Sequence, residues 1–377
     1  MTRIYLDHAA TTPLRPEALE AMKIAWDGTC GNPSSIHREG QKARKLLEEA
    51  RDRISANLDA FPEELYFCSG GTEANNWAIR AFSSLKKRHI IVSSIEHPSV
   101  LRTCEDLEKE GYRVTYLPVD EYGFVSPESL ENALSPDTSL VSVMLANNEI
   151  GTIEPVKELA EIAHKHGAFF HTDAVQAVGS IPVSFRDLGV DVLSFSGHKF
   201  GGPTGIGGLI VKRGLTLSPM ILGGEQESRH RAGTENLAGI LGMEKALSLA
   251  LQELPEKTLS LKALRNTLIH DIPESIPDAR LCGHPEKRLP GNAHFVFSRI
   301  SGEELLLYLN VDGFACSSGS ACTSSHHETS HVLKAIGLDP KTIRSALRIS
   351  LGSENTEEEI RSFISDLKKR VEELRKR

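Results

Sequence analysis

Short apolar runs recur through the first two thirds of the chain and are typical of buried strands. Between several of them, apolar residues recur with helical spacing, as in residues 77–85 and 156–163. This alternation of strands and helices predicts an α/β fold with a mainly parallel sheet covered by helices on both faces. The expected strands are residues 64–69, 89–94, 112–117, 140–146, 168–174, 191–196 and 205–211.

The pattern changes after about residue 236, where LAGILGMEKALSLALQEL predicts a long helix that could bridge to a second domain. Residues 257–377 mix helices with short strands such as 293–298 and 346–351. A capping box over residues 356–359 marks the start of the last helix. A chain of 377 residues is long for a single hydrophobic core, and two domains are therefore expected.

Composition narrows the class of protein. The net charge of −8 disfavours non-specific binding to nucleic acid, and direct DNA binding is not expected. No apolar run is long enough to span a bilayer, and the N-terminus lacks the apolar core of a signal peptide, so a cytoplasmic protein without membrane contact is expected. The six cysteines form no CxxC pair, which predicts reduced thiols, most of them buried for packing.

Candidate chemistry begins with Lys199, which follows an expected strand and precedes the glycine-rich run GGPTGIGG. A lysine in such a place can form a Schiff base with a carbonyl cofactor, although most lysines beside loops are simply solvated. Asp173 ends another expected strand and could pair with the ring nitrogen of pyridoxal phosphate (PLP), which would let the ring accept electrons. The alternative for Asp173 is a helix N-cap.

A glycine turn, Ser69–Glu73, lies between an expected strand and an expected helix. The backbone N–H groups of Gly71 and Thr72, with the Thr72 hydroxyl, could cradle a phosphate, whereas a plain capped helix start is the alternative. The cradle, Asp173 and Lys199 all lie at expected strand ends. Together they indicate a PLP site more specifically than any one of them does.

Four further residues are candidates for the same site. His97, after the strand 89–94, could stack on a cofactor ring or be an ordinary loop histidine, and Gln176 could donate to the phenolic oxygen of the ring. Asn148 could touch a substrate carboxylate. Arg348, expected to be buried on a strand, would need an anion, and a carboxylate binds guanidinium in a bidentate way.

The stretch from Ala315 to His327 is small, polar and poor in apolar anchors, which is typical of a mobile loop. Cys322 in this stretch is therefore a candidate reactive thiol, whereas Cys316 is expected to be structural. His326 and His327 could bind a metal with Cys322, but no full ligand set has fixed spacing, and no metal site is expected.

These residues lie in motifs by which the chain resembles a cysteine desulfurase of the NifS/IscS type, within the class V aminotransferases. The resemblance implies PLP-dependent fold type I. It also implies a large domain over residues 15–256 with a seven-stranded sheet, and a small α+β domain over 1–14 and 257–377 that carries the cysteine loop. The matching motifs are YLDHAATTPL, GNPSSIHREG, SGGTEANN, IEHPSV, NNEIGTI, HTDAVQAVG, SFSGHKFGGPTGIGGL, RAGTENLAG, SSGSACTSS and LRISLG.

The family's roles fall on individual positions of this sequence. The resemblance implies that Lys199 carries PLP as a Schiff base, that His97 is a catalytic residue stacked on the ring, and that Cys322 accepts the sulfur. Thr234 would reach the phosphate in the other subunit, which implies a homodimer. The remaining cofactor-binding residues would be Gly71, Thr72, Asp173, Gln176, Ser196 and His198, and the substrate-binding residues Asn32, Asn148 and Arg348.

The implied reaction converts L-cysteine to L-alanine, leaves a persulfide on Cys322 and passes the sulfur to an acceptor protein, as in iron–sulfur cluster assembly or tRNA thiolation. The sequence departs from the family at two places. His327–Glu328–Thr329 stands where Leu-Glu-Pro is frequent, and the chain lacks the longer tail by which some relatives dock a scaffold protein. A selenocysteine lyase or an aminotransferase on the same fold is the enzymatic alternative, and a persulfide or metal carrier is the non-enzymatic one.

Overall fold

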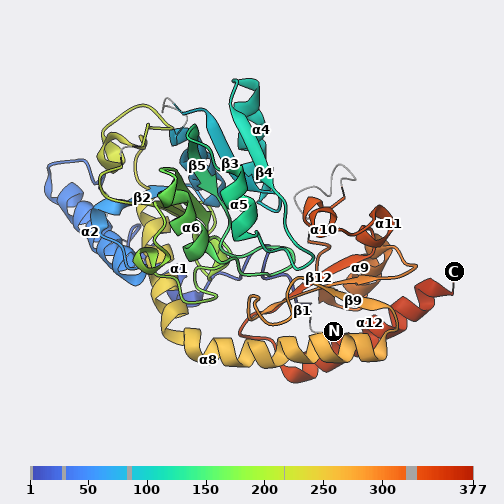
Figure 1. Cartoon of the computed structure of the whole chain (residues 1–377). Coiled ribbons are helices and arrows are strands. Elements are labelled where there is room, and N and C mark those ends of the chain that lie inside the picture. Colours follow the sequence, from blue (N-terminus) through green and yellow to red (C-terminus); the bar gives the residue numbers. More distant parts are fainter. Residues whose placement is uncertain (1–2, 28–30, 83–86, 216, 320–328, 377) are drawn as a thin grey trace.

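A computed structural model describes residues 3–27, 31–82, 87–215, 217–319 and 329–376 (Figure 1). Its main sheet has seven strands, as predicted, in the order β2-β8-β7-β6-β5-β3-β4. Strand β8 runs antiparallel to both neighbours, and the other pairs are parallel. The strands are β2 (Leu65–Cys68), β3 (His89–Ser93), β4 (Arg113–Leu117), β5 (Thr138–Ser142), β6 (Phe169–Asp173), β7 (Val192–Ser196) and β8 (Gly207–Val211).

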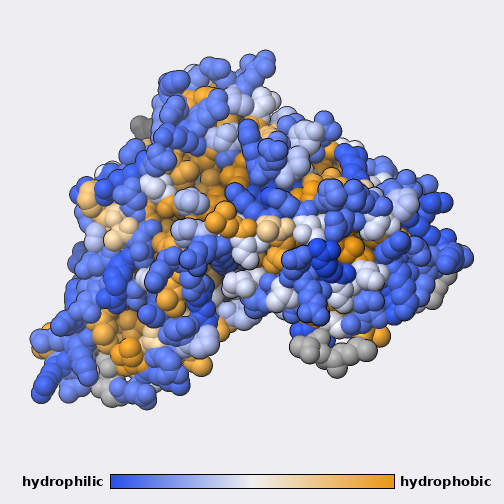
Figure 2. Space-filling model, turned by 90° about the horizontal axis from the view of Figure 1, so that it is seen from below, coloured by the Kyte–Doolittle hydropathy of each residue, from blue (hydrophilic) through white to orange (hydrophobic). Residues whose placement is uncertain are grey.

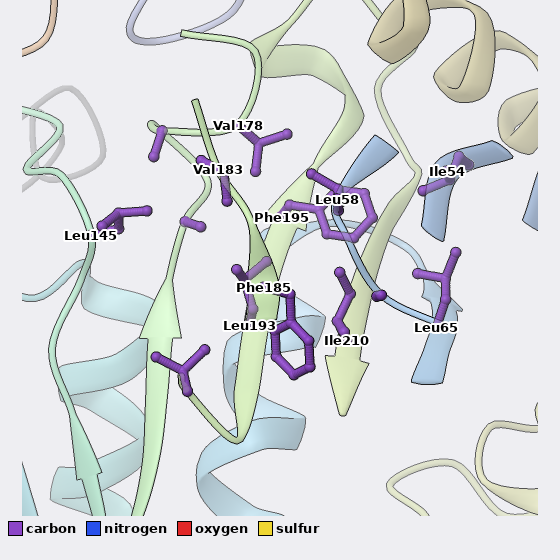
Figure 3. Packing of buried hydrophobic residues seen from close by; sticks show 14 of the residues in the cluster. Ile54, Leu58, Leu65, Leu145, Val178, Val183, Phe185, Leu193, Phe195 and Ile210 are labelled. Carbon is purple, nitrogen blue, oxygen red and sulfur yellow. The ribbon is translucent and has the colours of Figure 1, made fainter. Parts of the chain in front are cut away.

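Both faces of this sheet are covered, as predicted. Leu193 and Phe195 of β7 belong to one core, shown in part in Figure 3, whereas Val192 belongs to the core on the opposite face. All five residues of β7 are buried, because helices pack on both sides. The covering helices are α1 (Pro16–Lys23), α2 (Arg38–Asn57), α3 (Gly71–Ala81), α4 (Pro98–Lys109), α5 (Pro127–Ala133), α6 (Val156–Lys165) and α7 (Phe185–Leu188).

Helix α8 (Leu237–Ser275) is the predicted long helix, and it runs from the seven-stranded sheet to the C-terminal part of the chain (Figure 1). There a three-stranded antiparallel sheet has the order β12-β10-β9. A short parallel pair, β1 with β11, joins the N-terminus to the C-terminal part. The remaining elements are β1 (Ile4–Tyr5), β9 (Ala279–Cys282), β10 (Asn292–Phe297), α9 (Gly302–Val311), β11 (Phe314–Ala315), α10 (His331–Ala335), α11 (Pro340–Ile343), β12 (Ala346–Ser350) and α12 (Glu357–Arg375).

Local predictions about the end of the chain and about the cysteines can be checked directly. The capping box at α12 is confirmed, because Glu359 N donates to Thr356 Oγ1 and Thr356 N donates to Glu359 Oε2. Four described cysteines are free thiols, as expected: Cys68, Cys104, Cys282 and Cys316. Burial raises the pKa of each to about 12, which keeps them protonated and unreactive. Among the described helices, none has the length and apolar character needed to cross a bilayer.

Candidate active site

The carboxyl ends of β6 and β7 open onto a cavity of about 560 Å³. Helices α3 and α4 begin beside it, and β12 contributes a side chain from the C-terminal part of the chain. Ligands of open α/β sheets bind at this edge, because the loops after the strands gather there. Ten residues predicted from sequence line this one cavity: Gly71, Thr72, His97, Asn148, Asp173, Gln176, Ser196, His198, Lys199 and Arg348.

Lys199 stands at the end of a short 3-10 turn, Gly197–Lys199, that directly follows β7. Its Nζ donates to Ala9 O at 2.7 Å and to Ala10 O at 2.8 Å. Gln176 Nε2 donates to the same Ala9 oxygen at 3.0 Å. The N-terminal segment therefore holds Lys199 and Gln176 close together, and the lysine is half-buried in the cavity rather than solvated.

Asp173 is the last residue of β6 and is only 4% exposed. Its Oδ1 accepts from Val175 N at 2.9 Å, and its Oδ2 accepts from Asn75 Nδ2 at 2.6 Å. Residues 174–184 contain no helix, and the next one, α7, begins at Phe185. Asp173 is therefore not a helix cap, and its carboxylate is held between two donors at the edge of the cavity.

The first turn of α3 forms one wall of the cavity. No side chain caps this helix, so its first N–H groups remain available to a ligand. A Cβ atom at Gly71 would lie 2.7 Å from Val175 Cγ2, which shows how closely the helix start approaches the segment after β6. The acidic side chain of this turn, Glu73, is turned to an ion pair with Arg231 at 2.9 Å. The backbone donors of Gly71 and Thr72, beside Ser196, therefore form a cradle of suitable charge for a phosphate.

Two histidines in the cavity are held neutral by their surroundings. Burial lowers the pKa of His97, and its Nδ1 accepts from Ser99 N at 3.1 Å at the start of α4. Burial, with a smaller contribution from the charge of Lys199, lowers the pKa of His198 to about 4. A neutral imidazole at His97 can lie against an aromatic ring without the cost of burying a charge.

Arg348 is buried on β12, 2% exposed, as the sequence predicted. Its Nη2 pairs with Asp7 Oδ1 at 2.8 Å, and its Nη1 donates to Asn148 O at 3.0 Å. Its buried Nε has no hydrogen-bond partner among the residues that the structure describes. A buried donor left unpaired costs about 1–3 kcal/mol, so this guanidinium offers a site for an acceptor on a ligand.

Three predicted residues are not brought into the cavity by the described part of the chain. Asn32 is exposed, its Oδ1 accepts from Ser34 N at 2.9 Å, and it does not line the cavity. Thr234 is exposed on the segment before α8 and does not line it either. Cys322 lies outside the described residues, as do His326 and His327.

The cavity also contains residues that the sequence analysis missed. Asn75 lies three residues after Thr72 on α3, so helical spacing alone would have placed both on one face. Glu149 accepts from Ser330 Oγ at 2.6 Å, and burial raises the pKa of its carboxyl group. His331 lines the wall beside Ser330 and bonds Glu96 O at 2.8 Å. An acidic residue after a strand carries no signal of burial, which is why Glu149 was not anticipated.

Comparisons with known proteins agree with this geometry. The family model described as aminotransferase class V matches residues 4–363. The cysteine desulfurase IscS of Dictyoglomus turgidum is 49% identical, over 99% of this chain and 95% of its own length. A solved structure of a NifS-like protein superposes with a TM-score of 0.93 at 37% identity, covering 99% of this chain and all of the other. A second, titled "SspA in complex with cysteine", has a TM-score of 0.82 at 35% identity, covering 93% and 99% of the two chains.

The chain belongs to the class V aminotransferase family, and its fold is PLP-dependent fold type I. The resemblance inferred from the sequence motifs is thereby confirmed. The residues of the cavity fit PLP: the uncapped start of α3 suits its phosphate, the carboxylate of Asp173 suits its ring nitrogen, and the amine of Lys199 suits its aldehyde. Arg348, with its unpaired Nε, lines the same cavity.

Proposed function

We infer that this chain is a PLP-dependent cysteine desulfurase, which converts L-cysteine to L-alanine and holds the sulfur as a persulfide on Cys322 for an acceptor protein. One observation carries the inference: a single cavity contains a lysine, a carboxylate held by two donors, an uncapped helix start and a buried arginine with an unpaired N–H. The names of the relatives specify the substrate, because one is a cysteine desulfurase and another was solved with cysteine.

The cofactor would be held by residues from four elements. The first turn of α3 with Thr72, together with Ser196 and His198, would bind the phosphate, and Gln176 would bond the phenolic oxygen. Asp173 would face the ring nitrogen, and His97 would lie against the ring. When bound, PLP supplies an electron sink for the Cα of an amino acid. The protein's contribution is to place a base, an anion-binding group and a thiolate around that carbon.

Lys199 is the base in this proposal, and Arg348 with Asn148 orients the substrate through its carboxylate. The two residues are in direct contact, because Arg348 Nη1 donates to Asn148 O at 3.0 Å. Lys199 would take the proton from the substrate Cα and would then donate a proton to the bound cofactor. The Cys322 thiolate would then form a bond to the substrate sulfur while the carbon–sulfur bond breaks, with its electron pair going to the carbon fragment that becomes alanine.

The proposed function is tested by incubating the protein and PLP with L-cysteine in the absence of reductant. We expect alanine and protein-bound persulfide in equal amounts in the first turnover, and sulfide release once a thiol reductant is added. Alanine is measured by chromatography, and the persulfide is mapped by mass spectrometry. Formation of pyruvate or of a keto acid without persulfide would contradict desulfuration and favour the aminotransferase alternative.

We further propose a homodimer in which Thr234 completes the phosphate site of the other subunit. Thr234 is exposed and does not line the cavity of its own chain. The segment before it pairs with an exposed apolar segment, since Ala232 N donates to Ile221 O and the neighbouring Leu222 is 82% exposed. Apolar patches also interrupt the hydrophilic surface seen in Figure 2. Such patches are typical of surfaces that a partner covers.

Active-site complementation tests this arrangement. Lys199→Ala and Thr234→Ala chains, co-expressed with different tags, form mixed dimers in which one site carries both changes and the other carries neither. We expect these mixed dimers to regain about half of wild-type turnover at limiting PLP, because one of two sites is intact. Thr267→Ala, which removes an α8 hydroxyl that donates to Ala263 O at 3.3 Å, is the matched control. No recovery above the mean of the two parent variants would show that Thr234 acts within its own chain.

The cellular setting and the domain division are also proposals. Four free thiols among the described residues are in keeping with a cytoplasmic protein, in which the sulfur acceptor would belong to iron–sulfur cluster assembly or tRNA thiolation. Two separate cores support a large domain over residues 15–256 and a small one over 1–14 and 257–377, since Leu6 packs with residues 261–374 and not with the main sheet. Ile95, Met144 and Ile150 pack with C-terminal residues in a further cluster, which joins the two parts beside the cavity.

A further inference from the structure

A chain of hydrogen bonds connects Asp173 to His97 along the wall of the cavity. Asn75 Nδ2 lies 2.6 Å from Asp173 Oδ2 and 2.9 Å from Ser99 Oγ. Ser99 Oγ lies 2.8 Å from His97 Nδ1. Asn75 is 1% and Ser99 is 7% exposed, so water competes little with these bonds. Four side chains from α3, the start of α4 and the end of β6 are thus linked in one buried path.

The direction of each bond follows from the donors available. A carboxylate only accepts, so the Asn75 amide must donate to Asp173. The second N–H of the same amide points to Ser99, whose hydroxyl then accepts from Asn75 and donates to His97 Nδ1. That nitrogen also accepts from Ser99 N at 3.1 Å. His97 Nδ1 therefore carries no proton, and the remaining proton of the neutral ring is on Nε2.

In this orientation the Asn75 amide leaves its oxygen without a hydrogen bond, and the bonds donated by its nitrogen must offset that free-energy cost. Asn75 Oδ1 is buried and has no hydrogen-bond partner among the described residues. Turning the amide over would pair the oxygen with Ser99 at the expense of placing it 2.6 Å from a carboxylate oxygen. Bonds to charged groups are stronger than bonds between neutral groups, and the structure keeps the charged one. The bond to Asp173 thus determines which way the Asn75 amide is turned.

We propose that Asn75 is a positioning residue, which fixes the Asp173 carboxylate for the cofactor ring nitrogen and, through Ser99, fixes the tautomer of His97. The proposal rests on the proposed roles of Asp173 and His97 in the PLP site. Its consequence is that one buried path orients both the carboxylate expected at the ring nitrogen and the imidazole expected against the ring. Both oxygens of Asp173 accept from donors, which fixes the carboxylate, and His97 presents its Nε2–H because Nδ1 is occupied.

The test uses the PLP-loaded enzyme and reads cofactor binding and absorbance, not turnover alone. Asn75→Leu keeps the number and branching of the side-chain heavy atoms but removes both donated bonds. We expect PLP to dissociate with a constant raised about tenfold, the usual effect of losing one bond to a charged group. We also expect the pH at which the bound cofactor changes its absorption spectrum to shift from that of the wild type, because Asp173 loses a donor that stabilises its charge.

Ser99→Ala separates the two halves of the path, because it spares the bond from Asn75 to Asp173 and removes the hydroxyl bond to His97 Nδ1, which then accepts from the backbone N–H of residue 99 alone. We expect this variant to hold PLP within about threefold of wild type while the pH profile of kcat shifts. Thr103→Val is the matched control, since Thr103 is buried in α4 and donates only to Ser99 O at 2.8 Å. Wild-type PLP affinity and spectral pH dependence in Asn75→Leu would overturn the proposal, as would the same changes in Thr103→Val.

These outcomes are distinct from failure of the proposed function. If the wild-type chain bound PLP but formed no persulfide from L-cysteine, the desulfurase assignment would fall, while the cofactor titrations would still report on Asn75. If Asn75→Leu is too unstable to purify, Ser99→Ala decides alone: an unshifted pH profile of kcat would overturn the link to His97.

Discussion

Lys199→Ala is expected to lower turnover of L-cysteine by at least about 10³-fold, because the proposed mechanism uses this amine both to hold the cofactor and to move the Cα proton. Among the described residues that line the cavity, no other lysine is present to replace it. Lys199 lies in the turn after β7 and lines the cavity. Its Nζ donates to Ala9 O and Ala10 O. A steady-state assay of alanine formation measures the loss.

The matched control is Lys212→Ala. Lys212 follows the adjacent strand β8, is half-exposed and bonds Asp191 Oδ1 at 3.4 Å, away from the cavity. Asp191 keeps its other partners, His164 and the backbone N–H of Phe170, and turnover is expected to stay within about twofold of wild type. Reduction of the PLP-loaded protein with borohydride should label Lys199. A label on another lysine would refute the anchor, and so would substantial turnover by Lys199→Ala.

Much of the fold could be predicted because its physical causes are local. The strands of a sheet covered on both faces are continuous apolar runs, and each of the seven lies in or beside its predicted range. The strand predicted at 140–146 is Thr138–Ser142 instead, since the chain leaves the sheet after Ser142 toward the cavity and remains buried there. The antiparallel direction of β8 could not be predicted, because an apolar run of five residues is the same in either direction.

The place of a residue in the cavity could be predicted where the residue follows or ends an expected strand, as with Lys199 and Asp173. It could not be predicted where the partner is remote in sequence. Arg348 was expected to need an anion, yet Asp7, its ion-pair partner, is 341 residues away, and the two meet because the N-terminal segment pairs with Ser350 at the end of β12. Asn75 was missed because an asparagine in a helix has no distinctive role until its acceptor, Asp173, is placed beside it.

The second large effect is expected from replacing Cys322, the proposed acceptor of the substrate sulfur. Cys322→Ser should retain the yellow colour of bound PLP and still bind L-cysteine, but form no persulfide, with sulfide release reduced at least about 10³-fold. A serine hydroxyl remains protonated at neutral pH and is a poor nucleophile toward sulfur, whereas a thiolate attacks it readily. Cofactor absorbance with and without cysteine, together with sulfide assays, separates loss of chemistry from loss of binding.

Cys316→Ala is the matched control, since Cys316 lies six residues earlier in the same stretch of small, polar residues. Its thiol is buried, with a pKa raised to about 12, and it packs against the C-terminal core, so it should supply no thiolate. We expect Cys316→Ala to retain turnover and to lose at most about 1 kcal/mol of stability. The persulfide should then map to Cys322 in wild type and in Cys316→Ala alike. Because the three other described thiols, Cys68, Cys104 and Cys282, are buried and protonated, a persulfide on any of them would mean that the sulfur leaves the site by a route other than Cys322.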